Sequence, residues 1–451
     1  MKRIINSFLL EWKNRSNRKP LLLRGARQVG KTYSMRKLGQ TFKTFVEINL
    51  EANEAARNII KKDMDPVRIV RELSELLQVE IIPGSTLLFF DEIQIEPQAI
   101  TALRYFFEKM PDLHVTAAGS LLDFAIEQVG IPVGRVSSLY MYPLSFLEFL
   151  AALGHTEWVK LIIGHNPQTT LNEQVHKKLI GLIGEYIAIG GMPEAINEWI
   201  ATKTSRASKI VHSDLLFNYQ QDFGKYAKRH QIKYLNLLFE KATAQIGSKF
   251  MFTRVGEYQK RELEPTLNLL EKAGLIHKII CSSGQGIPLG AQAKPNDFKI
   301  IFLDVGLTQA LLKLDIVPWL LNPETKLINS GPIVEAFIGQ ELLAYSDPIS
   351  RESLFYWRKQ KHSSQAEVDY LTQIRQTVVP IEVKAGGSKR IKSMKIFIES
   401  HPNSAYGLRF SSDNYEKAQT IISYPLYATA KPFLDASQAL QEALLYLTEE
   451  T

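Results

Sequence analysis

The sequence predicts an α/β protein whose N-terminal part is a doubly wound parallel sheet. Apolar runs at residues 21–23 and 86–90 and the segment 114–120 predict its strands. Each run ends in small or polar residues and is followed by a helical pattern, which is the alternation that builds a parallel sheet. With 451 residues, the chain is too long for one hydrophobic core, so we expect further domains after the first.

The first strand leads into a glycine-rich loop. Residues 24–34 read RGARQVGKTYS and fit the pattern G-x-x-x-x-G-K-[ST] at every fixed position. Glycines let backbone N–H groups face an anion, and the following helix adds the positive end of its dipole. The pattern predicts that Lys31 reaches the β- and γ-phosphates of a nucleotide and that the Thr32 hydroxyl binds Mg²⁺; the alternative is a chance match in a surface loop. The expected nucleotide contacts are Gly25, Ala26, Arg27, Gln28, Val29, Gly30, Lys31, Thr32, Tyr33 and Asp91.

The second strand ends in two carboxylates, Asp91 and Glu92. Ligands of open α/β sheets bind at the carboxyl ends of the strands, so we expect Asp91 to hold the Mg²⁺ through water. Glu92 would polarise the attacking water, which favours hydrolysis over binding alone. A helix cap is the alternative explanation for this pair.

The third strand ends at Ser120. In a P-loop ATPase with this sheet, a small hydroxyl residue at that point lies beside the acidic strand and can sense the γ-phosphate. A helix N-cap for the segment from Leu121 onward explains the serine equally well.

These motifs together resemble the prokaryotic AAA-type ATPases, and more narrowly the family of ATP-binding proteins with a C-terminal domain of unknown function. The resemblance rests on the loop and on FFDEIQ, TAAGSLLDF, PVGRVSSLYMYPLSFLEFL and YIAIGGMPEAI, and it covers nearly the whole chain. It implies a doubly wound sheet over residues 1–150 and a helical lid over 151–215.

Arg135 lies within the PVGRV stretch of this pattern. An arginine there could stabilise the developing charge on a γ-phosphate, in the same chain or across a subunit boundary. A structural ion pair is the alternative, and Arg104 is a second candidate. AAA-type proteins often form rings, so a homo-oligomer is an open expectation.

The middle of the chain is basic. Residues 201–280 hold fourteen Lys and Arg against seven Asp and Glu, so this stretch accounts for the whole net charge of +7. Helical patterns at 233–239, 253–258 and 262–273, then strands at 275–280 and 298–304, predict a winged helix over residues 216–325. DNA is the partner that such a surface suggests. A solvated helical surface or a protein-binding winged helix remains an alternative.

The C-terminal part carries a PD-(D/E)xK pattern. Asp369 precedes a predicted strand that places Glu382 and Lys384 on one face, and Glu335 lies on an earlier predicted helix. In enzymes with this pattern the carboxylates hold Mg²⁺ against the scissile phosphate and the lysine activates water. We expect a restriction-endonuclease-like α/β domain over residues 326–451, with Glu335, Asp369 and Glu382 as metal ligands. A fold kept only for binding is the alternative.

Other features narrow the function. The single Cys281 excludes an internal disulfide, and no apolar run approaches the roughly 18 residues that span a bilayer. We therefore expect a cytoplasmic protein that uses no membrane. The sequence has no N/T-K-x-D motif for guanine, so the nucleotide we expect is ATP.

The resulting hypothesis is a Mg²⁺-dependent ATPase that controls a winged-helix and nuclease-like module acting on DNA. Two alternatives remain. One is an ATP-driven switch that binds a protein or DNA partner and has an inactive nuclease-like domain. The other is a nuclease in which ATP binding only gates access.

Overall fold

The computed structural model describes residues 1–359, 366–386, 391–418 and 420–449. Within these ranges, five parallel strands form the N-terminal sheet in the order β2-β3-β4-β1-β5. Their bounds are β1 Leu21–Arg24, β2 Thr44–Asn49, β3 Thr86–Asp91, β4 His114–Ala118 and β5 Ser137–Tyr140. The expected parallel α/β sheet of a P-loop NTPase is therefore confirmed.

Helices cover both faces of this sheet because its strands are apolar on both sides. Alternate residues of β3 enter different cores: Leu87 and Phe89 join one, while Leu88 and Phe90 join the other. The helices are α1 Ile4–Asn14, α2 Lys31–Gly39, α3 Glu54–Lys62, α4 Pro66–Leu77, α5 Pro97–Lys109 and α6 Leu122–Val129.

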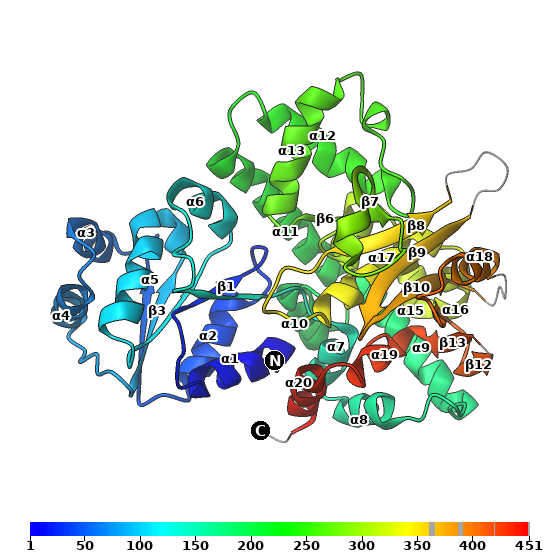
Figure 1. Cartoon of the computed structure of the whole chain (residues 1–451), viewed down its shortest axis with the longest axis horizontal. Helices are drawn as coiled ribbons and strands as arrows, with labels where there is room; N and C mark the ends of the chain where they lie inside the picture. Colours follow the sequence, from blue (N-terminus) through cyan, green and yellow to red (C-terminus); the bar gives the residue numbers. More distant parts are fainter. Residues whose placement is uncertain (360–365, 387–390, 419, 450–451) are drawn as a thin grey trace.

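A helical region follows the sheet and joins it to the rest of the molecule (Figure 1). Its members are α7 Phe146–Ala152, α8 Thr156–Gly164, α9 Glu173–Ile189, α10 Pro193–Thr202, α11 Ser205–Tyr226, α12 Ile232–Ala242 and α13 Lys260–Lys272. Among the described residues no single helix is long and apolar enough to cross a membrane; only α9 and α10 taken together, bent by 119°, meet the length and composition criteria.

The expected helix at 253–258 is wrong, because the structure has only a 3₁₀ turn at Phe252–Arg254. The Gln245 side chain accepts from the backbone N–H of Met251 and donates to its carbonyl, which fixes the chain just before this segment. Gly256 interrupts it further on.

A second sheet contains eight strands in the described residues, in the order β12-β13-β11-β10-β9-β8-β6-β7. The strands are β6 Ile276–Ser282, β7 Ala293–Phe302, β8 Leu354–Arg358, β9 Glu367–Ile374, β10 Thr377–Lys384, β11 Gly407–Ser411, β12 Glu416–Ala418 and β13 Ile421–Pro425. The β6–β7 hairpin, expected as a wing, pairs through β6 with β8 in parallel. One sheet therefore continues across the expected boundary between residues 325 and 326.

Helices flank this second sheet, and one continuous core connects it with the lid and α1. They are α14 Val305–Leu311, α15 Val317–Leu321, α16 Pro323–Ile328, α17 Gly331–Ala344, α18 Lys392–Ser400, α19 Lys431–Leu434 and α20 Gln438–Thr448. The basic run Lys389-Arg390-Ile391-Lys392 predicts a helix start after the Glu382–Lys384 strand. Residues 389 and 390 lie outside the described residues, and α18 begins at Lys392.

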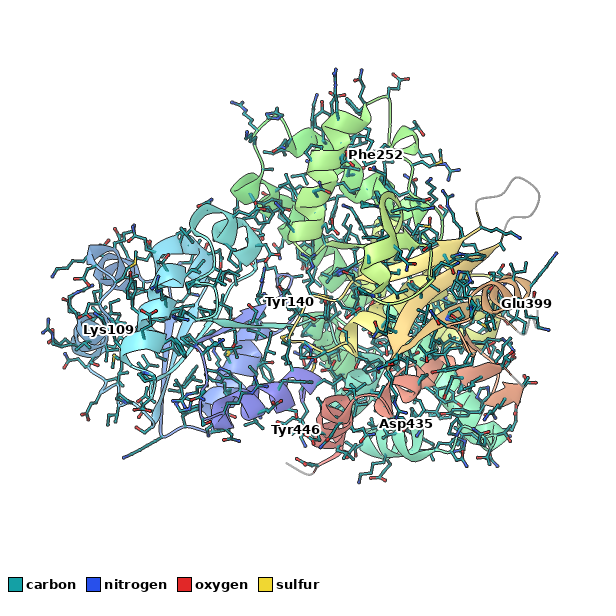
Figure 2. All side chains as sticks on the ribbon, viewed as in Figure 1. Lys109, Tyr140, Phe252, Glu399, Asp435 and Tyr446 are labelled. Carbon is teal, nitrogen blue, oxygen red and sulfur yellow. The ribbon has the colours of Figure 1, made fainter. Side chains whose placement is uncertain are left out.

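The two ends of the described chain lie close together, because α20 packs against α1. The N-terminal sheet also meets the second half of the molecule directly. Tyr140, at the end of β5, donates its backbone N–H to the carbonyl of Pro348 at 2.8 Å and lies near the centre of the molecule (Figure 2). The nucleotide motifs are therefore placed beside the C-terminal part of the chain.

Candidate functional site

The glycine-rich loop joins β1 to α2, and its backbone needs glycine at both fixed positions. Gly25 has a φ of 147°, and a Cβ there would lie 2.2 Å from the carbonyl oxygen of Met141. Gly30 adopts the left-handed region at a φ of 102° and begins α2. Arg3 holds the loop from outside, because its guanidinium donates to the Val29 carbonyl at 2.8 Å. The loop is thus curled tightly at the start of a helix.

Lys31 is buried under this loop. Its ammonium donates to the carbonyls of Gly25 at 3.0 Å and Ala26 at 2.7 Å. Burial lowers the pKa of Lys31 to about 8, although Glu92 and Asp91 nearby oppose the shift. The ammonium is therefore held at the mouth of the loop, where the phosphates of a nucleotide would compete for it.

Thr32 lies in contact with Asp91, the last residue of β3. The Thr32 hydroxyl donates to Asp91 Oδ2 at 3.0 Å. Burial raises the pKa of Asp91. A hydroxyl and a carboxylate oxygen at one point are the hard ligands that Mg²⁺ prefers, with the remaining positions left for nucleotide oxygens and water. These two residues fit a Mg²⁺ ion, and Glu92 follows directly at the end of the strand.

Gln94 is a residue that the sequence reasoning missed. Its side-chain amide donates to Glu92 Oε2 at 2.5 Å and so fixes the carboxylate expected to activate water. Gln94 packs so closely on Gly119 that a Cβ there would lie 2.0 Å from Gln94 Oε1. The sequence does contain one signal for Gln94: it ends the FFDEIQ motif, two residues after Glu92.

Ser120 is buried and lies between the phosphate loop and the acidic strand. β4, which ends two residues earlier, is the strand between β1 and β3. Ser120 lines a cavity of about 140 Å³ together with Arg27, Glu92 and Gln94. The structure therefore brings Ser120 to the side of the loop where Glu92 stands.

The two arginines considered for contact with a γ-phosphate do not lie beside the phosphate loop. Arg135 and Arg104 both donate to Glu108 Oε1, at 3.1 and 2.9 Å. Their side chains are about half-exposed, and neither is among the described residues lining the cavities beside the loop. Tyr33 is likewise turned outward, and its hydroxyl accepts from the amino group of Met1 at 2.7 Å.

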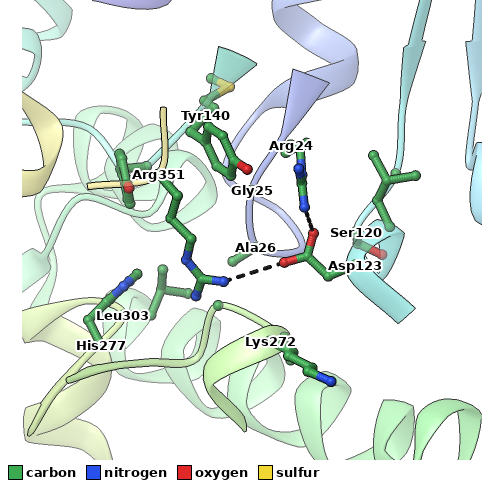
Figure 3. Close-up of a pocket in the computed structure, with 16 residues that line it drawn as sticks. Arg24, Gly25, Ala26, Ser120, Asp123, Tyr140, Lys272, His277, Leu303 and Arg351 are labelled. Carbon is green, nitrogen blue, oxygen red and sulfur yellow. Dashed lines mark hydrogen bonds and ion pairs between the residues drawn. The ribbon is translucent and has the colours of Figure 1, made fainter. Parts of the chain in front are cut away.

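A second cavity, of about 40 Å³, adjoins the start of the loop at Gly25 and Ala26. Figure 3 shows the Asp123 carboxylate between two arginines, Arg24 and Arg351. Asp123 forms an ion pair with each of them, at 3.4 Å in the case of Arg351. Since Arg351 lies far along the chain, just before β8, this contact ties the nucleotide motifs to the second half of the molecule.

Two further contacts attach α6 and the loop to the basic middle region. Lys272 on α13 forms an ion pair with Glu127 on α6. Arg27 in the phosphate loop pairs with Asp222 on α11 at 2.6 Å. Lys272 is one of three basic residues on or beside the predicted helix 262–273, with Lys260 and Arg261. Lys260 is also bound, to Asn296 and Glu264, whereas Arg261 is exposed.

The C-terminal candidates gather at the second sheet. The backbone N–H of Val383 donates to Asp369 Oδ2 at 2.7 Å, and Lys384 forms an ion pair with Glu382. Burial raises the pKa of Glu335 and of Glu382 to about 7.

Two residues that the sequence reasoning missed belong to this cluster: Lys299 on β7 and Glu367 on β9. Lys299 lies 2.9 Å from Glu335 and 2.6 Å from Glu367. We call Glu335, Glu367, Asp369 and Glu382, with Lys299 and Lys384, the carboxylate–lysine cluster.

Three family models match different parts of the chain. Residues 17–150 match the model of an AAA domain. Residues 180–316 match a domain of unknown function, DUF8612, and residues 330–428 match another, DUF4143. No curated protein matches the chain.

Solved structures show distant similarity. The Walker-type ATPase PABY2304 of Pyrococcus abyssi is 14% identical, with a TM-score of 0.44 over 68% of this chain and 95% of that one. The Aeropyrum pernix ORC1 protein, solved in complex with DNA, is 11% identical, with a TM-score of 0.28 over 68% and 90%. PCH-2 of C. elegans is 16% identical, with a TM-score of 0.25 over 43% and 58%. The family match supports an AAA-type domain over residues 17–150.

Proposed function

We propose that the chain is a Mg²⁺-dependent ATPase whose nucleotide state controls its C-terminal module. The observation that carries this proposal is the convergence of Lys31, Thr32, Asp91 and Glu92 at the end of a parallel sheet. Lys31 and the loop N–H groups bind the phosphates, which compete with the carbonyls of Gly25 and Ala26 for the ammonium.

The chemical step follows from the same residues. Thr32 and Asp91 would hold a Mg²⁺ ion, which would supply positive charge against the phosphates. Glu92, oriented by Gln94, accepts a proton from the attacking water. Ser120 contacts the γ-phosphate from the neighbouring strand. Arg135 lies away from the loop of its own chain, so we propose that it acts on the nucleotide of a neighbouring subunit.

The contacts of α6 supply a route for control. α6 begins two residues after Ser120 and carries Asp123, Phe124 and Glu127. Asp123 pairs with Arg351, Glu127 pairs with Lys272, and the ring of Phe124 stacks on Tyr226 with centroids 4.7 Å apart. A shift of Ser120 on γ-phosphate binding would therefore move α11, α13 and the segment before β8 together.

The C-terminal module is proposed to be nuclease-like and to act on DNA. The element order α17-β8-β9-β10-α18-β11 supports a nuclease-like module. β9 pairs antiparallel with both β8 and β10, and β10 pairs parallel with β11. The sheet brings Asp369 next to the Glu382–Lys384 strand, as the PD-(D/E)xK chemistry requires. The α12, α13 and β6–β7 elements support a winged helix, and exposed Arg261 is available to a phosphate.

A binding module that cuts nothing is the second candidate, and the position of Lys299 favours it. Its ammonium is fully buried and contacts the carboxylate of Glu335, which the sequence pattern assigned to metal binding.

The test measures phosphate release from ATP together with cleavage of plasmid and single-stranded DNA, in Mg²⁺ or Mn²⁺. Lys31→Ala is expected to abolish ATP hydrolysis, while Lys37→Ala, an exposed lysine on the same helix, serves as its control. The double variant Asp369→Ala/Glu382→Ala is expected to lose cleavage and to keep ATP hydrolysis. ATP hydrolysis with uncut DNA under every condition would establish the second candidate. Equal ATP hydrolysis in Lys31→Ala and the unaltered chain would refute both.

A further inference from the structure

The carboxylate–lysine cluster already contains a fixed cation on one side. Lys299 is buried with none of its side chain exposed. Its ammonium lies 2.9 Å from Glu335 and 2.6 Å from Glu367. An isolated buried ammonium is strongly unfavourable, so such a lysine is stable in the core only with carboxylate partners. Glu335 and Glu367 are the partners that the fold provides.

Lys299 fills one side of the cluster. Its ammonium donates to Glu335 Oε1 at 2.9 Å, so this oxygen is already occupied by a cation. A divalent cation would have to displace a paired positive charge to reach it.

The other side of the cluster has an open position. Glu382 is only 5% exposed; its Oε1 accepts from Lys384, but its Oε2 has no hydrogen-bond partner among the residues that the structure describes. A buried carboxylate oxygen without a partner is costly and calls for a proton or a cation. Asp369 lies alongside, because its Oδ2 accepts from the N–H of Val383, the residue after Glu382.

We propose that this cluster has two cation positions, one filled permanently by the Lys299 ammonium and one, between Asp369 and Glu382, that takes a single divalent cation. Glu335 is then the counter-ion of Lys299 and no metal ligand. Asp369 and Glu382 supply two carboxylates to this position. Mg²⁺ and Mn²⁺ accept such a site when water or phosphate oxygens complete the shell.

This inference rests on the proposed nuclease-like module and defines its ion requirement. A site with one divalent ion and a fixed ammonium is electrostatically different from a two-metal site, in which the second ion stabilises the leaving oxygen. Here the ammonium would take over that charge without exchanging with solvent ions.

The test counts Mn²⁺ ions bound to the full chain by electron paramagnetic resonance of free Mn²⁺, without nucleotide. An Asp91→Asn background removes the carboxylate of the ATP site. We expect one bound Mn²⁺ in this background, one also after adding Glu335→Gln, and none after adding Asp369→Asn. Glu335→Gln is a matched control, because Lys299 keeps its contact with Glu367.

Lys299→Met is the complementary variant. Removing the ammonium leaves its carboxylates unpaired, so we expect a second bound Mn²⁺ and a midpoint of thermal unfolding that rises by several degrees with Mn²⁺. If this variant does not fold, the numbers of Mn²⁺ ions bound by the Glu335→Gln and Asp369→Asn variants still test the proposal. Loss of Mn²⁺ in Glu335→Gln, or two ions or none in the background protein, would overturn the proposal. Phosphate release from ATP and DNA cleavage are measured separately, so a failure of the proposed function leaves the ion count interpretable.

Discussion

Lys31 provides a sharp test of the nucleotide site through pH. Its pKa is lowered to about 8, chiefly by burial. Phosphate binding needs the ammonium form, so the affinity for ATP should fall as the pH rises through the pKa of the free protein. From pH 7 to 9.5 we expect a loss of about 30-fold, because only about one lysine in thirty stays protonated at the higher pH. A lysine with the ordinary pKa would lose only about a tenth of the affinity over this range.

The assay is calorimetric titration of Mg·ATP into the Glu92→Gln variant, in which turnover does not interfere. Buffers of different ionisation enthalpy would reveal the proton taken up above pH 8. Lys31→Arg is the control, because a guanidinium stays charged throughout and should abolish the pH dependence whatever its affinity. An affinity that stays flat to pH 9.5, or that falls equally in Lys31→Arg, would refute the reasoning.

Three further changes probe the site and its connection. Glu92→Gln should reduce phosphate release by at least roughly 100-fold and leave ATP binding nearly unchanged, and equal losses of both would contradict its role as the base. Gly119→Ala should displace Gln94 and lower kcat by roughly tenfold, about the worth of one hydrogen bond to a charged group. The double variant with Gln94→Ala should be no slower than either single variant, and additive losses would argue against this link. Arg351→Ala should keep ATP hydrolysis within about threefold, as expected for a partly exposed ion pair, and remove nucleotide-dependent hydrogen exchange at β8. Unchanged exchange there would show that the contact with Asp123 transmits nothing.

The N-terminal site could be predicted because its chemistry is local in sequence. The glycines, Lys31 and Thr32 lie within one loop, and Asp91 with Glu92 ends one strand, so motif and strand order place them together. Gln94 could have been inferred only from its proximity to Glu92, since its close packing on Gly119 depends on the neighbouring strand.

The C-terminal half was harder to predict because its contacts are long-range. Lys299 lies on a strand that the sequence assigned to a wing, and only the eight-stranded sheet brings it beside Glu335 and Glu367. The pair of Asp123 and Arg351 joins residues 228 positions apart, which periodicity cannot reveal. Arg135 shows that a matching motif does not by itself fix a position in space. It pairs with Glu108 and does not lie at the phosphate loop of its own chain.

The most direct test of nucleotide control is hydrogen exchange of the Glu92→Gln variant with and without Mg·ATP. The account predicts slower exchange in the phosphate loop and, in addition, altered exchange in α13 and in the segment from Arg351 through β8. Changes confined to the N-terminal sheet and its helices would contradict it, because ATP would then be bound without any effect on the C-terminal module.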